Sequence, residues 1–215
     1  MEHSLIQGLV RGPDARSRVS IHSPPRAITA GPVRADDRIL SLTPIFHDMS
    51  LYDIFGTLAA GATIILPDPQ IRKDPLHWVD AMVRHKVTLW NSVPTMLQVL
   101  VEYLDERNDL TRPPIRLAFV GGETVTPTLA DRFTALFNEA QMVSVGGPTE
   151  TTLWNIMHPI KSSDIRRQKI PYGKPISNSQ YYVLNESMVE RPVWVTGELY
   201  CAGVGLAKGY WNDDQ

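Results

Sequence analysis

The sequence predicts an α/β fold: a doubly wound, mostly parallel sheet flanked by helices, followed by part of a small β-rich lobe of the distorted-barrel type. From Arg34 to Trp154, short apolar runs alternate with amphipathic helical segments, which is typical of parallel sheets. After Trp154 the apolar runs continue without long helical segments between them. Polar and glycine-rich clusters follow several of the runs, and parallel sheets bind ligands beyond these strand ends.

Each element of the first region follows from its periodicity and its boundary residues. We expect strands at residues 38–42, 62–66, 87–90, 115–120 and 141–145. We expect helices at residues 50–60, 75–85, 94–104 and 128–138. In the first helix, Ser50 is the expected N-cap and Gly61 the expected end. Its apolar residues at helical spacing are Leu51, Ile54, Phe55 and Leu58.

The changes of pattern divide the chain into three parts. Residues 1–32 carry prolines, arginines and serines without sustained periodicity, which predicts a poorly ordered leader with at most a short strand at Ser20–His22. Residues 33–154 form the predicted α/β subdomain. Residues 155–215 form the predicted partial β-rich subdomain, with strands expected at 155–160, 180–184 and 197–201 and an exposed charged loop at 161–169.

Composition excludes several classes of function. The chain has 215 residues, 43% apolar and 20% charged, which is ordinary for a globular protein with a sizeable core. The net charge is -2, and no basic stripe interleaves with aromatic residues, which argues against nucleic acid or a membrane surface as a partner. No run reaches the roughly 20 apolar residues of a membrane span, and Cys201 is the single cysteine. Together these features predict a cytoplasmic protein.

The most informative motif is Gly-Gly-Pro-Thr-Glu at residues 146–150, directly after a predicted strand. The glycines let backbone N–H groups approach a ligand closely, the Thr149 hydroxyl can donate to a phosphate, and the Glu150 carboxylate can hold Mg²⁺. The same letters also suit an ordinary surface turn. Two further clusters follow predicted strands, at residues 46–48 and 121–123. Their convergence at one sheet edge favours a nucleotide site over a turn.

These clusters, in this order, resemble the adenylation domains of nonribosomal peptide synthetases, within the adenylate-forming (AMP-binding) ligase superfamily. The resemblance runs from about Pro32 to Tyr210. It rests on six ordered landmarks: residues 46–62, 87–94, 121–123, 147–150, 172–176 and 197–210. The Leu-Trp-Asn-Ser-Val-Pro landmark and the paired glycines are similar to those of cysteine-activating domains.

The resemblance implies a two-step reaction. A carboxylate attacks the α-phosphate of ATP to give an acyl-adenylate and pyrophosphate, and the acyl group then passes to the phosphopantetheine thiol of a peptidyl carrier protein. Thr149 would contact phosphate and Glu150 would ligate Mg²⁺, as the catalytic pair. The implied nucleotide-binding residues are Gly121, Gly122, Glu123, Gly146, Gly147, Pro148 and Thr149.

The resemblance also implies a substrate pocket. Asp48 matches the carboxylate that pairs with the α-ammonium of an amino acid, a contact that discriminates against simple carboxylic acids; the alternative is a helix cap or a surface acid. Large side chains leave little volume, so a small substrate is expected: cysteine first, then alanine, glycine or serine. The other implied pocket residues are Met49, Tyr52, Asn91, Phe119, Gly121, Val145, Leu153 and Trp154.

Two residues depart from the family pattern. Gly146 stands where most of the family has an aromatic residue that stacks on adenine, so nucleotide affinity is either lower or supplied by another platform. His47 resembles the histidine of acyl- and aryl-acid ligases in the same superfamily, which keeps a fragment of such a ligase as an alternative function. A polar residue at a strand end is an equally good explanation of His47.

The activity of this chain alone is a separate question. The family places a phosphate loop upstream of Arg34, and a ribose-contact motif and a lid with a catalytic lysine downstream of the matched region; this sequence contains none of them. We therefore expect a fragment in which adenylate formation is lost by several orders of magnitude, because charge neutralisation and water exclusion are missing. A non-catalytic, degenerate binding module is the alternative.

Overall fold

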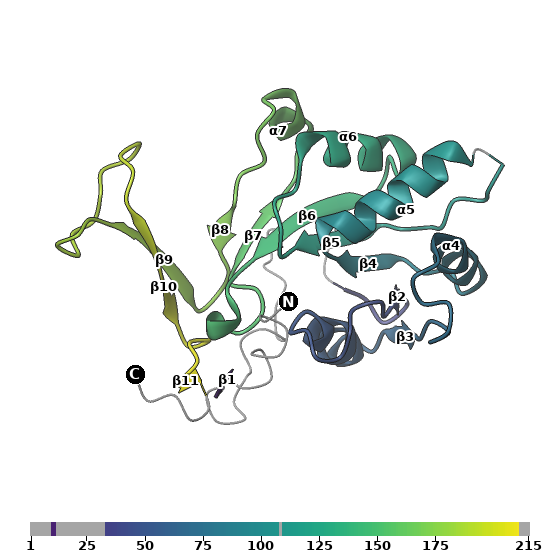
Figure 1. The fold of residues 1–215 in the computed structure, drawn as a ribbon, viewed down its shortest axis with the longest axis horizontal. Coiled ribbons are helices and arrows are strands. Elements are labelled where there is room, and N and C mark those ends of the chain that lie inside the picture. The colour runs from purple at the N-terminus through teal and green to yellow at the C-terminus, as the bar shows by residue number, and fades with distance from the viewer. Residues whose placement is uncertain (1–9, 12–32, 108, 211–215) are drawn as a thin grey trace.

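A computed structural model describes residues 10–11, 33–107 and 109–210. Its main feature is a seven-stranded sheet in the order β3-β2-β4-β5-β6-β7-β8 (Figure 1). The first five of these strands run parallel. They are β3 (Thr63–Ile65), β2 (Arg38–Leu40), β4 (Leu89–Ser92), β5 (Leu117–Gly121) and β6 (Gln141–Gly146). The predicted doubly wound, mostly parallel sheet is confirmed.

Three amphipathic helices cover one face of the sheet (Figure 1). They are α4 (Pro75–Arg84), α5 (Pro94–Glu106) and α6 (Pro127–Leu136). Each begins with proline, whose fixed φ suits the first helical position. The side chains of Asp74 and Thr126 cap α4 and α6 by accepting from backbone N–H groups of the first turn.

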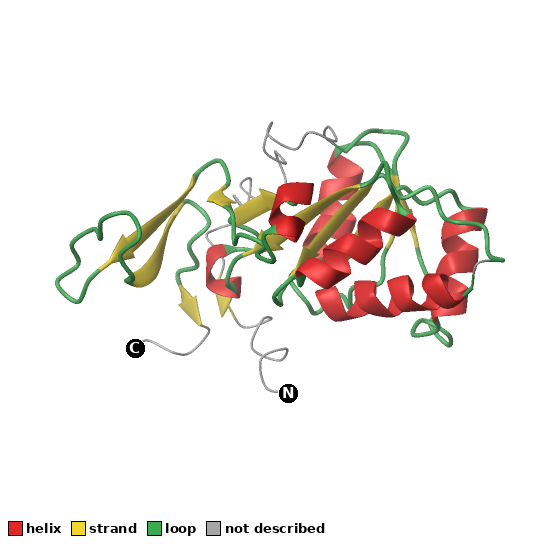
Figure 2. Cartoon of the chain, turned by 90° about the horizontal axis from the view of Figure 1, so that it is seen from above, coloured by secondary structure: helices red, strands yellow, loops and turns green. Residues whose placement is uncertain are grey.

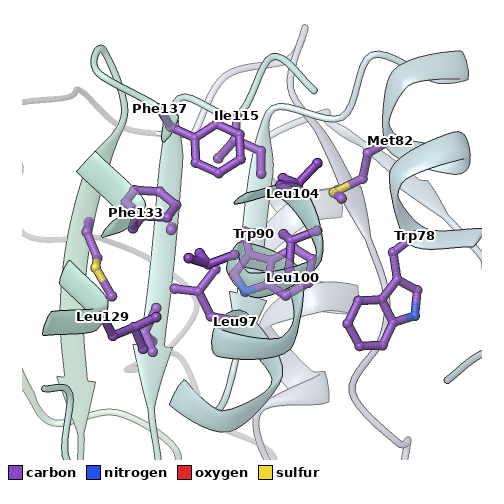
Figure 3. Packing of buried hydrophobic residues seen from close by; sticks show 14 of the residues in the cluster. Trp78, Met82, Trp90, Leu97, Leu100, Leu104, Ile115, Leu129, Phe133 and Phe137 are labelled. Atoms are coloured by element: carbon purple, nitrogen blue, oxygen red, sulfur yellow. The ribbon is translucent and has the colours of Figure 1, made fainter. Parts of the chain in front are cut away.

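The larger core lies between these helices and the sheet (Figure 3). Trp90 from β4, Leu97 and Leu100 from α5, and Phe133 from α6 are all at most 1% exposed. Burying one such side chain stabilises the fold by roughly 1.5–3 kcal/mol. This core holds the strands rigidly, so that their carboxyl ends form a fixed edge.

The segment after β2 is helical, but its orientation differs from the expectation. Residues 50–59 form one helical stretch that contains a π-helical turn, η2 (Tyr52–Gly56), followed by α3 (Thr57–Ala59). Ser50 is not its cap: the hydroxyl donates to the Ile45 carbonyl, 3.1 Å away. The predicted apolar stripe faces outward, with Phe55 49% exposed, while the opposite face is buried. Tertiary contacts explain this orientation, because the buried face carries Tyr52 and Asp53, which contact Phe119 and Asn91 on the sheet.

The last part of the chain adds strands of two kinds. The strand β7 (Ile156–Pro159) extends the large sheet by pairing antiparallel with β6, and β8 (Lys174–Pro175) pairs antiparallel with β7. The strands β9 (Ser179–Leu184) and β10 (Glu198–Gly203) form a separate antiparallel pair, which projects away from the helices (Figure 2). The first part of the predicted β-rich region thus belongs to the main sheet. The predicted subdomain limits stay predictions.

One predicted loop is a helix. Residues 161–169 contain α7 (Ser162–Arg166), because the buried carboxylate of Asp164 accepts from the Lys161 backbone N–H at 2.9 Å and holds the first turn. The same carboxylate lies 2.8 Å from Nε2 of His158 on β7. The contact ties this helix to the sheet.

The termini complete the description. A short pair joins β1 (Val10–Arg11) to β11 (Gly209–Tyr210). The rest of the predicted leader, including the strand suggested at Ser20–His22, lies outside the described residues. Within the described ranges, no helix has both the length and the apolar character that crossing a bilayer requires.

Candidate functional site

The predicted clusters meet at the carboxyl edge of the parallel strands. Asp48 lies after β2, and Thr149 lies after β6. The Thr149 hydroxyl donates to Oδ2 of Asp48 at 2.9 Å. The residue predicted to hold an ammonium group and the residue predicted to hold a phosphate are therefore in direct contact. This is the arrangement that a reaction between a carboxylate and a phosphate requires.

The paired glycines are packed too tightly for side chains. Gly147 has a φ of 148°, and a Cβ there would lie 2.6 Å from Oδ1 of Asn155 and 2.8 Å from the Leu153 carbonyl. The Asn155 backbone N–H donates to the Gly146 carbonyl at 2.9 Å, and its side-chain amide donates to the Thr151 hydroxyl at 2.7 Å. Asn155, which the sequence analysis did not single out, braces the turn.

A cleft of about 520 Å³ opens beside this turn. It lies on the side of the sheet that the helices cover. Met142 on β6 packs in the core between the sheet and the helices. Because side chains alternate along a strand, Ser144 and Gly146, which line the cleft, lie on that same side. The predicted nucleotide residues that line it are Gly122, Glu123, Gly146, Gly147 and Pro148.

Gly121 does not line the cleft, and Glu123 lines it but also makes a contact with Thr95. Gly121, the last residue of β5, is buried, and a Cβ there would meet the Val145 carbonyl at 2.2 Å. Glycine therefore allows β5 and β6 to run close together at the edge. Glu123 is exposed at the cleft rim, where its carboxylate accepts from the Thr95 hydroxyl at 2.7 Å.

A tyrosine that the sequence analysis gave no role also lines the cleft. Tyr172 precedes β8 and lies directly beside Gly146, with its side chain about half exposed. The only sequence signal was its place in the Tyr-Gly-Lys-Pro-Ile landmark. Its contact with Gly146 depends on the pairing of β7 with both β6 and β8.

Glu150 stands in a short 3₁₀ turn, η3 (Thr149–Thr151), and is exposed. Two hydrogen bonds join this region to residues near the end of the described chain. The Ala207 N–H donates to the Glu150 carbonyl at 2.6 Å, and the Thr152 hydroxyl donates to the Gly205 carbonyl at 2.7 Å. Within the described ranges, no group of three or more His, Cys, Asp or Glu side chains could hold a metal ion. A single carboxylate still suits Mg²⁺, which commonly binds through one carboxylate, substrate phosphates and water.

Asp48 is electrostatically prepared to stay ionised. Burial alone would raise its pKa, but hydrogen bonds from His47 and Thr149 hold the pKa of this carboxyl below its usual value. Nδ1 of His47 lies 3.2 Å from Oδ1 of Asp48. An ionised, partly buried carboxylate attracts an ammonium group.

The predicted substrate residues gather on the opposite side of the same edge. Tyr52 contacts Trp154 and Phe119, with ring centroids 4.7 Å and 4.9 Å apart, and the Phe119 and Trp154 rings are 5.2 Å apart. Met49, Val145 and Leu153 are buried in the same cluster. We call these six residues the aromatic pocket. The three rings pack against one another at its centre.

Asn91 borders the aromatic pocket from β4, where it pairs with Phe119 on β5. Its amide nitrogen donates to Oδ1 of Asp53 at 2.7 Å and to the Met49 carbonyl at 3.2 Å. Because the Met49 carbonyl can only accept, the amide orientation is fixed, and its oxygen Oδ1 is left without a partner among the described residues. The buried hydroxyl of Tyr52 is likewise without a partner there.

Asp53 is the functional candidate that the sequence analysis missed. It is fully buried beneath Asn91, and burial raises its pKa to about 7, against hydrogen bonds from Asn91, Ser41 and Thr43. An acid next to Tyr52 in the sequence was the only available signal. Its burial could not be foreseen, because the neighbouring apolar residues suggested the opposite helix face.

A glycine-lined cleft, a Thr-Glu turn and a partly buried carboxylate thus lie together at the carboxyl edge of the parallel strands, where sheets of this kind bind ligands. The chain belongs to the AMP-binding enzyme family, whose pattern matches residues 17–211. Pyochelin synthetase PchF from Pseudomonas aeruginosa is 38% identical over 183 residues, which are 85% of this chain and 10% of that protein.

Solved structures of nonribosomal peptide synthetases share the fold. The AMPPNP-bound form of FmoA3 is 42% identical with a TM-score of 0.79, over 85% of this chain and 20% of that one. PA1221, which contains adenylation and PCP domains, is 25% identical with a TM-score of 0.77, over 86% of this chain and 32% of that one. The resemblance to these synthetases is confirmed, and the chain spans only a small part of each relative.

Proposed function

We propose that this chain supplies the central part of an amino-acid-activating adenylation domain. The contact between Asp48 and Thr149 carries the proposal, because it brings an ammonium-binding carboxylate and a phosphate-binding hydroxyl into one site. The reaction joins ATP and an amino acid to give aminoacyl-AMP and pyrophosphate. One carboxylate oxygen of the amino acid forms a bond to the α-phosphorus, and the bond from that phosphorus to the leaving pyrophosphate breaks.

The residues of the chain divide this work. Asp48 accepts hydrogen bonds from the substrate ammonium, which places the substrate carboxylate at the sheet edge. Thr149 exchanges its bond to Asp48 for one to a phosphate oxygen. Glu150 would hold Mg²⁺, which neutralises phosphate charge when bound. The cleft beside Gly146 and Gly147 takes the nucleoside, since backbone can approach it there without side-chain obstruction.

The proposed acceptor of the activated acyl group is the phosphopantetheine thiol of a peptidyl carrier protein. The similarity to PA1221, whose structure combines adenylation and PCP domains, supports this partner. The thiol attacks the acyl carbon of the adenylate, AMP leaves, and a thioester forms. These steps concern the whole protein that carries the chain.

The proposed substrate is a small amino acid whose side chain ends in a hydrogen-bond donor, with cysteine first and serine as the nearest competitor. The unpartnered oxygen Oδ1 of Asn91, on the sheet face that carries Phe119, supports this choice because a buried acceptor without a partner costs about 1–3 kcal/mol. A thiol or hydroxyl on the substrate would satisfy it. One solved form of FmoA3 holds α-methyl-L-serine-AMP, the adenylate of a small amino acid with a hydroxyl group.

ATP–pyrophosphate exchange by the natural protein that contains this chain tests the function. We expect exchange with cysteine well above that with alanine. The Asp48→Ala variant should lose roughly 30- to 1,000-fold in kcat/KM, the effect of removing one partner of a buried charge pair. Asp36→Ala, which removes an exposed acid outside the site, is the matched control and should leave exchange unchanged.

The outcomes separate the alternatives. If none of the amino acids supports exchange, the proposal is overturned. Amino-acid binding by calorimetry without exchange would establish a non-catalytic binding module instead. An Asp48→Ala variant that still prefers cysteine to 3-mercaptopropionate would contradict the role of Asp48. Equal exchange with both compounds in the unaltered protein would favour an acyl-acid ligase, for which His47 was the sequence signal.

A further inference from the structure

Gly146 leaves a gap that another residue fills. A Cβ placed on Gly146 would lie 2.6 Å from Cε2, 2.9 Å from Oη and 3.0 Å from Cζ of Tyr172. Distances this short exclude any side chain at position 146 while the ring stays in place. The Tyr172 ring therefore occupies the space into which a side chain at position 146 would extend.

The fold delivers Tyr172 to this place through the close approach of two strands. Gly173 has a φ of 128°, and a Cβ there would meet the Met157 carbonyl at 2.2 Å. The backbone therefore passes directly against β7 just before β8 begins, where Met157 pairs with Lys174. Because β7 also pairs with β6, the tyrosine that precedes Gly173 reaches the end of β6.

The surroundings of the ring suit the binding of a flat ligand. Tyr172 is 52% exposed and lines the cleft together with backbone from Gly122, Gly146 and Gly147. Tyr181 packs against it edge-on, with centroids 6.4 Å apart and an interplanar angle of 85°. One part of the ring is thus held by the protein and another part is open to the cleft, where a purine can stack on it.

We propose that Tyr172 is the stacking platform for the adenine base, in place of an aromatic side chain at position 146. This inference rests on the proposed use of ATP at the same cleft. The two positions act as alternatives: an aromatic ring is supplied either from the end of β6 or from the segment before β8. Glycine at position 146 then leaves room for the Tyr172 ring, and the paired glycines also let a ligand approach the backbone N–H groups of the turn.

The test is the affinity for AMPPNP, measured by calorimetry on the natural protein that contains this chain. We expect Tyr172→Ala to weaken binding about 5- to 150-fold, the range produced by losing one base–aromatic stack. Tyr172→Phe, which keeps the ring, should bind within about 2-fold of the unaltered protein, and Tyr172→Leu, which keeps apolar volume without a ring, should resemble Tyr172→Ala.

A reciprocal exchange separates stacking from folding. Gly146→Tyr alone should impair binding because of the collision with Tyr172, whereas Gly146→Tyr combined with Tyr172→Ala should recover at least about 5-fold over Tyr172→Ala alone. Unchanged affinity in Tyr172→Ala, or a double variant that recovers nothing, overturns the platform. Absence of AMPPNP binding by the unaltered protein would instead overturn the proposed function itself, and the platform with it.

Discussion

The nucleotide cleft and the aromatic pocket occupy the same sheet edge but are built by opposite means. The cleft is an open space of about 520 Å³ whose lining includes glycine at positions 122, 146 and 147. The pocket is closed by three aromatic rings with centroids 4.7–5.2 Å apart. The first region owes its shape to missing side chains, and the second to closely packed ones.

The two regions also differ in polar satisfaction. At the cleft, the turn groups are paired: Thr149 donates to Asp48, and Asn155 braces Gly146. At the pocket, Oη of Tyr52 and Oδ1 of Asn91 are buried without partners among the described residues. The pocket therefore gains more from a polar ligand than the cleft does, which is how a site achieves discrimination between similar small molecules.

The largest effect expected is on the pocket. Phe119→Ala removes a fully buried ring from β5 and should lower the free energy of unfolding by about 3–5 kcal/mol. Phe119→Leu, which keeps most of the volume, should cost less than about 1.5 kcal/mol. Urea denaturation measures both. Similar losses in the two variants would contradict the close packing of the pocket.

The second effect is a pH dependence located beneath the pocket. Since burial raises the pKa of Asp53 to about 7, the folded protein keeps a proton that the unfolded carboxyl releases near pH 4. The free energy of unfolding should therefore fall as pH rises from about 4 to 7, by at most about 4 kcal/mol. Acids with lowered pKa values, such as Asp48, act with the opposite sign below this window.

Asp53→Asn is the control for this pH dependence. The amide accepts a hydrogen bond from Asn91 but does not titrate, so the difference in unfolding free energy between the unaltered protein and the variant should change between pH 5 and pH 8. Chemical denaturation at both values measures it. A constant difference would show that Asp53 is ionised in the folded protein.

The smallest effect concerns the cleft and uses two neighbouring glycines. Gly147→Ala places a Cβ against backbone and forces alanine to a φ of 148°, which should cost about 1–3 kcal/mol of unfolding free energy. Gly146→Ala meets only the half-exposed ring of Tyr172, which can move aside, so the cost should stay below about 1 kcal/mol. Thermal unfolding compares them. Equal losses would mean that the ring is fixed.

Much of the fold was predictable because it depends on local pattern. Residues 117–120 are continuously apolar, and residues 141–145 are apolar except for Gln141 and Ser144. Strands buried on both faces favour such a composition. The helices α4 and α6 carry their caps in the sequence, at Asp74 and Thr126. The strand ends then place the motifs on one edge.

The errors fall where tertiary contacts overrule local pattern. The apolar stripe that includes Phe55 predicts the wrong buried face of this helix. Tyr52 and Asp53 lie inward instead, because Tyr52 packs against the ring of Trp154 and Asp53 accepts a hydrogen bond from Asn91. The helix α7 depends on a carboxylate shared with β7. Neither preference is visible in a single segment.

The family, the order of the strands along the chain and the edge at which the predicted site residues gather could all be inferred from the sequence, since each depends on periodicity and on contiguous motifs. The place of Tyr172 beside Gly146 and the hydrogen bond between Asn91 and Asp53 became visible only in the folded chain. The physical reason is that such contacts join residues from separate segments. Their geometry exists only after the sheet has brought β6, β7 and β8 side by side.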